Sequence, residues 1–140
     1  MLSTLFLSTV CVANPVDVDT RLPFEIVPVR EIAPLDYAEL FEEDIARDKN
    51  GLPLRFALPT EVLITPSSHG IWEQLGDSKV RWSYRLRCDN ARSMNLGFSK
   101  YTMPPSGTMT IRSAAIDFQI RPLTSDDNKD HGELWTPIVP

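Results

Sequence analysis

Hydrophobic and polar residues alternate most regularly over residues 79–88, where an apolar or aromatic residue occupies every second position. The positions between them carry a serine and the three arginines Arg81, Arg85 and Arg87. A period of two is typical of a strand with one buried face and one solvated face, as antiparallel sheets allow. The pattern therefore predicts a central strand here, with Trp82 on its buried face.

Shorter runs of the same kind lie on both sides of this segment, separated by turns rich in glycine, proline, serine, asparagine and aspartate. Several short strands at this spacing are typical of a β-sandwich or barrel-like domain. The expected fold class is mainly β: an antiparallel β-sandwich-like domain preceded by a proline-rich linker and one amphipathic helix. The other predicted strands are residues 55–64, 71–74, 93–98, 108–112, 116–121 and 134–139.

The period changes to that of a helix over residues 35–48, where apolar residues recur at intervals of three and four. Asp36 is a suitable N-cap, and Glu39 three residues later completes a capping-box pattern. The Asn50-Gly51 pair and the following proline end the pattern. We therefore predict one amphipathic helix at this point.

The first 34 residues are expected to lie outside the domain. Residues 1–13 form an apolar run that is too short to span a membrane but suits a signal-peptide core. Cys11 and Ala13 place small residues at positions −3 and −1 of a cut before Asn14. A disordered or mis-started N-terminus is the alternative. Residues 14–34 carry four prolines and are predicted to be an extended linker, which leaves residues 35–140 as the domain.

Charge is distributed unevenly along the 140 residues. The net charge of −5 and the lack of a groove-reading motif argue against a nucleic-acid partner. Residues 17–48 carry ten acids and three bases, whereas residues 79–100 carry six bases and one acid. Both regions can be solvated faces, or the acidic segment can pack across the basic strand. A third interpretation makes Arg81, Arg85, Arg87 and Arg92 a docking face for an acidic protein partner.

The candidate catalytic residues do not form a convincing set. Gly76-Asp77-Ser78 resembles the Gly-Asp-Ser of serine hydrolases, but it lies between two predicted strands, where Gly-Asp is common in hairpin turns. His69 and His131 lie in polar loops without an evident orienting carboxylate and nucleophile. A turn and two surface histidines are the favoured interpretation.

Metal and cofactor motifs are equally weak. Asp126, Asp127, Asn128 and Asp130 offer oxygen ligands, but the glycine and glutamate of a calcium loop are missing, so a polar turn is favoured. Cys11 and Cys88 lack metal-binding spacing, and no glycine-rich phosphate loop precedes a helix. We therefore expect no metal and no cofactor. Each of the three tryptophans lies in a predicted strand and is expected in the core rather than on a ligand platform: Trp72, Trp82 and Trp135.

Several strings occur in an order that resembles the N-terminal pro-region of secreted bacterial lysyl endopeptidases and related trypsin-like serine proteases. The resemblance runs from about Ala46 to the end of the chain. The strings are RDKNGLPLRFA (47–57), GIW (70–72), RWSYRLR (81–87), ARSMNLGF (91–98), YTMP (101–104) and DNKDHGELWTPIVP (127–140).

The resemblance implies a folded, non-catalytic, β-rich prodomain that assists folding of the protease and keeps it inactive. The family's catalytic triad lies downstream of this region, so no catalytic residue is carried over. The implied partner is a trypsin-like protease domain, and the implied location is secreted or periplasmic, with no membrane span in the mature form. The family pattern continues beyond Val139-Pro140, so a truncated C-terminus is expected.

Two other classes of function stay open. One is a secreted carbohydrate- or surface-binding β-sandwich that uses exposed tryptophan or tyrosine. The other is a small hydrolase that uses Ser78 with His69 or His131. Exposed stacked aromatic rings would favour the first alternative, and a close approach of serine, histidine and acid would favour the second.

Overall fold

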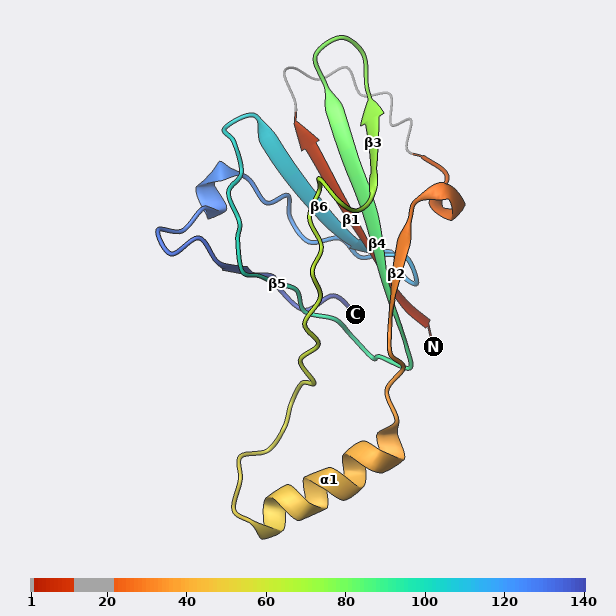
Figure 1. The fold of residues 1–140 in the computed structure, drawn as a ribbon, viewed down its shortest axis with the longest axis vertical. Coiled ribbons are helices and arrows are strands. Elements are labelled where there is room, and N and C mark those ends of the chain that lie inside the picture. The colour runs from red at the N-terminus through yellow and green to blue at the C-terminus, as the bar shows by residue number, and fades with distance from the viewer. Residues whose placement is uncertain (1, 12–21) are drawn as a thin grey trace.

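The protein is built on a five-stranded mixed sheet, seen in a computed structural model that describes residues 2–11 and 22–140 (Figure 1). The strands are β1 (Leu2–Cys11), β2 (Val29–Ile32), β3 (Ile71–Gln74), β4 (Val80–Asp89) and β6 (Gly107–Ser113). Their order is β2-β4-β1-β6, and β3 also pairs with β4. The predicted mainly-β class with one α-helix is confirmed.

Strand β4 organises this sheet. Residues 81–89 of this strand pair antiparallel with β1, from Leu2 opposite Asp89 to Val10 opposite Arg81. On its other edge β3 pairs antiparallel with the first part of β4, and β2 pairs parallel with the second part. The predicted all-antiparallel arrangement is therefore wrong at β2. The sequence did not predict this strand because prolines surround it, although its own four residues contain no proline.

The expected boundaries at the N-terminal end need correction. Residues 22–34 are not a plain linker, since they contain the 3₁₀ turn η1 (Phe24–Ile26) and strand β2. Residues 2–11, expected to be a signal-peptide core, form β1 between β4 and β6. A signal role for this run stays a prediction, and the cut before Asn14 lies outside the described residues. If residues 2–11 were cleaved off as a signal peptide, the mature chain could not contain β1.

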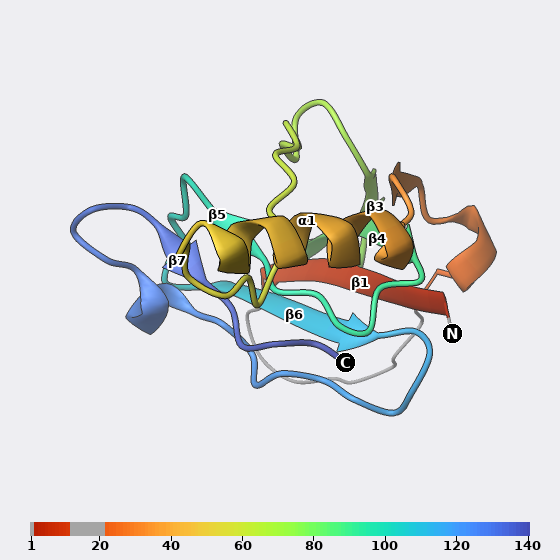
Figure 2. The ribbon, with the colours of Figure 1, turned by 90° about the horizontal axis from the view of Figure 1, so that it is seen from below.

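The single α-helix, α1 (Tyr37–Lys49), begins close to its predicted position. The Asp36 side chain caps it by accepting hydrogen bonds from the backbone N–H groups of Ala38 and Glu39. No residue of α1 is buried, so its apolar stripe is not packed against the sheet. Figure 1 shows the helix apart from the sheet, and Figure 2 shows it running across the lower end of the molecule.

The hydrophobic core lies on one face of β4 and β6. Trp82, Tyr84 and Leu86 from β4 pack there with Met109 and Ile111 from β6. The later part of the chain covers these side chains with Tyr101, Met103, Ile120, Leu123, Leu134 and Val139. The alternation in residues 79–88 therefore predicted both the strand and its buried face.

A second, two-stranded sheet joins β5 (Gly97–Phe98) to β7 (Leu134–Trp135). A single bridge between Met94 and Val139 extends this contact. The strands predicted at 93–98 and 134–139 are thus present but much shorter. Those predicted at 55–64 and 116–121 are absent, since residues 55–64 pair with no strand and residues 116–121 make only an isolated bridge from Gln119 to Arg112.

Candidate functional site

The strongest candidate from the sequence, the arginine face of β4, is occupied largely by partners from the same chain. Arg81 is buried, and its Nε atom lies 2.9 Å from Oε2 of Glu73. Glu73 stands directly opposite Arg81 in the β3–β4 register. A buried, two-point ion pair of this kind fixes strand register. The prediction that Arg81 points outward to solvent is therefore wrong.

Arg85 holds the N-terminal segment against β4. Its Nε atom donates to the carbonyl of Val27 over 2.7 Å, and its guanidinium carbon lies 4.2 Å from the centre of the Phe24 ring. The backbone N–H of Arg85 also donates to the carbonyl of Pro28. Val27 is almost completely buried as a result. This arginine is a structural clamp on η1 and the start of β2.

Arg87 and Arg92 make looser contacts with the same region. Arg87 donates from Nε to Oδ1 of Asp89 over 2.8 Å, and its NH1 atom lies 3.7 Å from Oε1 of Glu31 on β2. The hydrogen bond to Asp89 raises the pKa of the Arg87 guanidinium. Arg92 lies over the ring of Tyr37 at 5.7 Å. Residues 24–37 thus pack along the arginines, mainly through backbone carbonyls and aromatic rings, with Glu31 as an acidic contact.

These contacts change the meaning of the arginine pattern. Each of the four arginines has a partner within residues 24–89, so together they attach the N-terminal segment and β3 to β4. The acids of α1 do not take part, because Glu43 and Asp44 pair with Arg55 instead. A docking role for Arg85, Arg87 and Arg92 stays a prediction.

The serine and histidine candidates are not brought together as a catalytic set. Ser78 lies in the β3–β4 hairpin turn, where Leu75 donates to the carbonyl of Lys79, and the predicted turn is confirmed. His69 precedes the other end of β3, and Nδ1 of His131 accepts from the backbone N–H of Glu133. The hydrolase pair of Ser78 with His69 is therefore split across the length of a strand.

One serine–histidine contact escaped the sequence analysis. The Oγ atom of Ser68 lies 2.8 Å from Nδ1 of its neighbour His69, in the turn that precedes β3. Ser68 also contacts the hydroxyl and carbonyl of Thr65, which closes this turn. Among the described residues, no carboxylate is hydrogen-bonded to His69, whose ring packs edge-on against Tyr84. This geometry builds a turn and lacks the orienting acid of a triad.

The three tryptophans differ in burial. Trp82 is a core residue, and its indole N–H donates to the carbonyl of His69. Trp72 is 54% exposed and Trp135 is 70% exposed, so their predicted core positions are wrong. Both lie on short edge strands. Among the described residues, β3 pairs only with β4, and β7 pairs only with β5. Sequence alternation alone does not show which side of a short strand is covered.

The acidic stretch near residue 127 is a structural turn. Asp127 is buried, pairs with Arg121 through two hydrogen bonds and accepts from the backbone N–H of Thr124. The side chain of Asn128 brackets the backbone of Met103, accepting from its N–H and donating to its carbonyl. The predicted polar turn is thus confirmed, and two of the four candidate ligands are engaged. The described residues contain no group of three or more ligand-type side chains suited to a metal ion.

Replacing Asp127 with asparagine is expected to destabilise the protein in a pH-dependent way. The Arg121 hydrogen bond lowers the pKa of Asp127 to about 2, so the carboxylate stabilises the folded state above its unfolded pKa of about 4. This stabilisation is lost as the pH falls toward 2. The variant should lose about 1–2 kcal/mol at pH 7, after solvent screening, and almost nothing near pH 2. Urea unfolding at both pH values measures this; an equal loss at both would contradict it.

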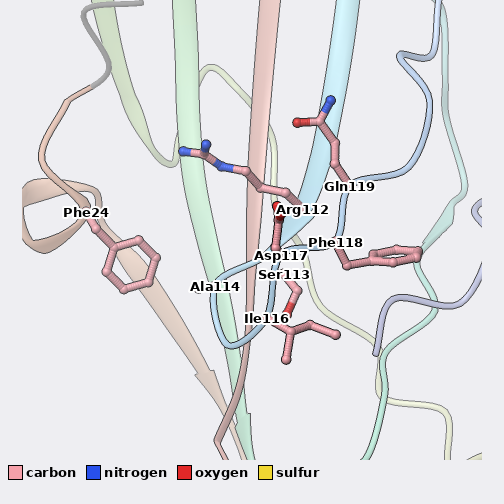
Figure 3. Close-up of a pocket in the computed structure, with 8 residues that line it drawn as sticks. All are labelled: Phe24, Arg112, Ser113, Ala114, Ile116, Asp117, Phe118 and Gln119. Atoms are coloured by element: carbon pink, nitrogen blue, oxygen red, sulfur yellow. The ribbon is translucent and has the colours of Figure 1, made fainter.

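A shallow hollow lies where the loop after β6 turns back beside η1 (Figure 3). It has a volume of about 370 Å³, and its lining includes Phe24, Arg112, Ile116 and Asp117. The Oγ atom of Ser113, also in the lining, accepts from the backbone N–H of Ala115 and so belongs to the turn. The hollow combines apolar and polar groups but presents no nucleophile–base pair.

A protruding arm is the most unusual surface, and the sequence analysis did not identify it. It comprises residues 37–63: α1 and the extended segment that follows (Figure 1). Arg55 ties the two together, donating to Glu43, to Asp44 and to the carbonyl of Leu40. Eight large apolar residues of the arm are exposed: Tyr37, Phe41, Leu52, Leu54, Phe56, Leu58, Val62 and Leu63.

Comparison with known proteins adds no assignment to this geometry. No family model matches the chain, and no solved structure matches it. Across residues 2–11 and 22–140, no helix combines the length and apolar character needed to cross a bilayer.

Proposed function

We propose that the chain is a non-catalytic pro-region-like domain of a secreted trypsin-like serine endopeptidase, which assists folding of the protease and holds it inactive. The resemblance in the sequence supports this proposal. Several of the resembling strings also contact one another in the fold.

Three pairs of strings make these contacts. GIW (70–72) lies in and beside β3, opposite RWSYRLR (81–87) in β4. The backbone N–H of Met94, in ARSMNLGF, donates to the carbonyl of Val139 near the end of the last string. The backbone N–H of Met103, in YTMP, donates to Asn128 of that same string. Three pairs of the resembling strings therefore contact each other in the fold, whereas RDKNGLPLRFA (47–57) lies in the exposed arm.

The proposal is tested with a lysyl endopeptidase catalytic domain produced without its own pro-region. The chain should inhibit cleavage of a small lysyl amide substrate and raise the yield of active enzyme when the denatured catalytic domain is refolded beside it. Bovine serum albumin serves as the protein control. Unchanged cleavage and unchanged refolding yield would overturn the proposal.

The chain itself should show no protease or esterase turnover. Ser78 lies in a hairpin turn, and no carboxylate of the described residues orients the Ser68–His69 pair, so we expect neither serine to be activated. Substitution of Ser78 or of Ser68 by alanine should change nothing in an assay with a p-nitrophenyl ester. Robust turnover that either substitution abolishes would favour the hydrolase alternative.

The carbohydrate-binding alternative gains one observation, the exposure of Trp72 and Trp135. The two residues lie on different sheets, and the stacked ring pair nearest to Trp72, Trp82 on Tyr84, is buried. Saccharide binding by a single exposed indole would change its fluorescence. Titration with soluble polysaccharides, with Trp72→Ala and Trp135→Ala in parallel, tests this alternative.

A further inference from the structure

We propose that the arm, residues 37–63, is the surface that docks the chain onto a protease catalytic domain, through an exposed sheet edge and apolar pockets on that domain. The inference rests on the proposed function and assigns it a binding surface. The predicted protease-binding surface is then not the arginines of β4, most of whose groups are engaged within the chain. It is a segment that lies away from the core.

The part of the arm that follows α1 has backbone groups without a backbone partner. Within residues 54–63, all of which the structure describes, no backbone N–H or C=O group pairs with another backbone group. Such a row of free donors and acceptors is what β-augmentation uses to add a strand to the edge of another sheet. Pro59 interrupts the row, which confines the pairing surface to the residues before it.

The side chains of this segment are presented in a fixed orientation. Arg55 points inward and is held by α1, with only 16% of its side chain exposed. Its neighbours Leu54 and Phe56 are 83% and 100% exposed. Arg47 supports the same geometry by donating to the carbonyl of Pro53. Arg55 therefore holds the segment against α1, and Leu54 and Phe56 are left exposed to solvent.

This orientation sets the chemistry of the partner. Side chains such as Leu54 and Phe56 are stabilised only when a partner removes them from water, and large exposed apolar patches mark interaction sites. The pockets that receive them must therefore be apolar. The Arg55 side chain is already paired with Glu43 and Asp44, so the partner does not bind it in a pocket.

The charge of the arm adds a second requirement. Residues 37–63 carry six acids and three bases. Arg55 neutralises part of the pair Glu43 and Asp44, while Glu39 and Glu42 are exposed on α1. A cationic rim around the apolar pockets of the partner would complement this charge, steer association and make it sensitive to salt.

The experiment uses the full chain and a lysyl endopeptidase catalytic domain whose catalytic serine is changed to alanine, so that binding is measured without digestion. The test variant is Leu54→Asp with Phe56→Asp; both side chains are exposed, so folding should be retained. The matched control is Ile116→Asp, an exposed apolar residue outside the arm. Circular dichroism melting checks the fold of each protein, and titration calorimetry at low and raised salt measures binding.

The double variant should bind at least about thirtyfold more weakly than the parent chain, the loss typical of two central contact residues. The control should bind within about twofold of the parent. A further variant, Arg55→Ala, releases the segment from α1 and should weaken binding about tenfold, since the segment must then be ordered on binding. Raised salt should weaken binding of the parent.

The contrary outcomes separate the two proposals. Equal binding by the parent chain and the double variant would overturn the docking surface and leave the proposed function standing. No binding by the parent chain at any concentration would overturn both. A parent chain that dimerises by sedimentation, with the double variant monomeric and binding to the catalytic domain unchanged, would assign the arm to a second copy of this chain and overturn the inference.

Discussion

Replacing Trp82 with alanine is expected to lower the free energy of unfolding by about 3–5 kcal/mol. The side chain is only 2% exposed, stacks on Tyr84 at 5.8 Å between ring centres, and donates its indole N–H to the carbonyl of His69. The substitution removes the packing and leaves that carbonyl without its donor. Since a domain of this kind has about 5–15 kcal/mol in total, the variant should be close to unfolding.

Thermal and urea unfolding measure this effect, and a fall in the melting temperature of about 10–20 °C is expected. Trp72→Ala is the matched control, because Trp72 stands directly opposite Trp82 in the register and is already half exposed. It should cost much less. If Trp82→Ala melts within a degree or two of the parent, the assigned core face of β4 is wrong.

Replacing Gly70 with alanine is expected to cost about 2–5 kcal/mol, for two reasons that add. Gly70 has a φ of +80°, a left-handed conformation that residues with a side chain rarely adopt. An added Cβ atom would also lie 2.3 Å from the indole nitrogen of Trp82 and 2.7 Å from the carbonyl oxygen of Ser83. Neither atom can move away easily, because both belong to the interior of the sheet.

Gly76→Ala separates the two reasons. Gly76 has nearly the same φ, +77°, but no atom lies within 4 Å of its added Cβ. This variant should show the cost of the backbone conformation alone, about 1–2 kcal/mol. Equal stability of the two variants would show that the indole of Trp82 does not press against Gly70.

The alternating residues 79–88 were sufficient to predict β4, its buried face and Trp82 in the core. The same reasoning failed at residues 55–64, because alternation describes a side-chain pattern and a strand also needs a partner for its backbone. Pro59 removes one donor there, and Arg55 ties the segment to a helix instead of a sheet. The side chains of the arm are exposed because Arg55 contacts α1. A local sequence pattern does not predict such a long-range contact.

The arginines of β4 show a second limit of sequence analysis. Their spacing correctly placed them on the face opposite the core, but spacing does not reveal what covers that face. Arg81 is buried and paired with Glu73 from the neighbouring strand, and Arg85 is partly covered by Phe24 and Val27 from far earlier in the chain. Whether a charged face of a strand is exposed therefore depends on residues that contact it only in the folded sheet.

The place of β1 between β4 and β6 has a consequence for how the protein folds. Residues 2–11 form this strand, yet both of its neighbours lie beyond residue 79. The sheet cannot close until Gly107–Ser113 has been made, so β1 lacks its full set of partners while the intervening residues are synthesised. Pairings between such distant segments are slow to form because a long loop must be closed first. Pairing of β1 should therefore come late in folding, with a long-lived open state in which other polypeptides can reach the unpaired edges of the sheet.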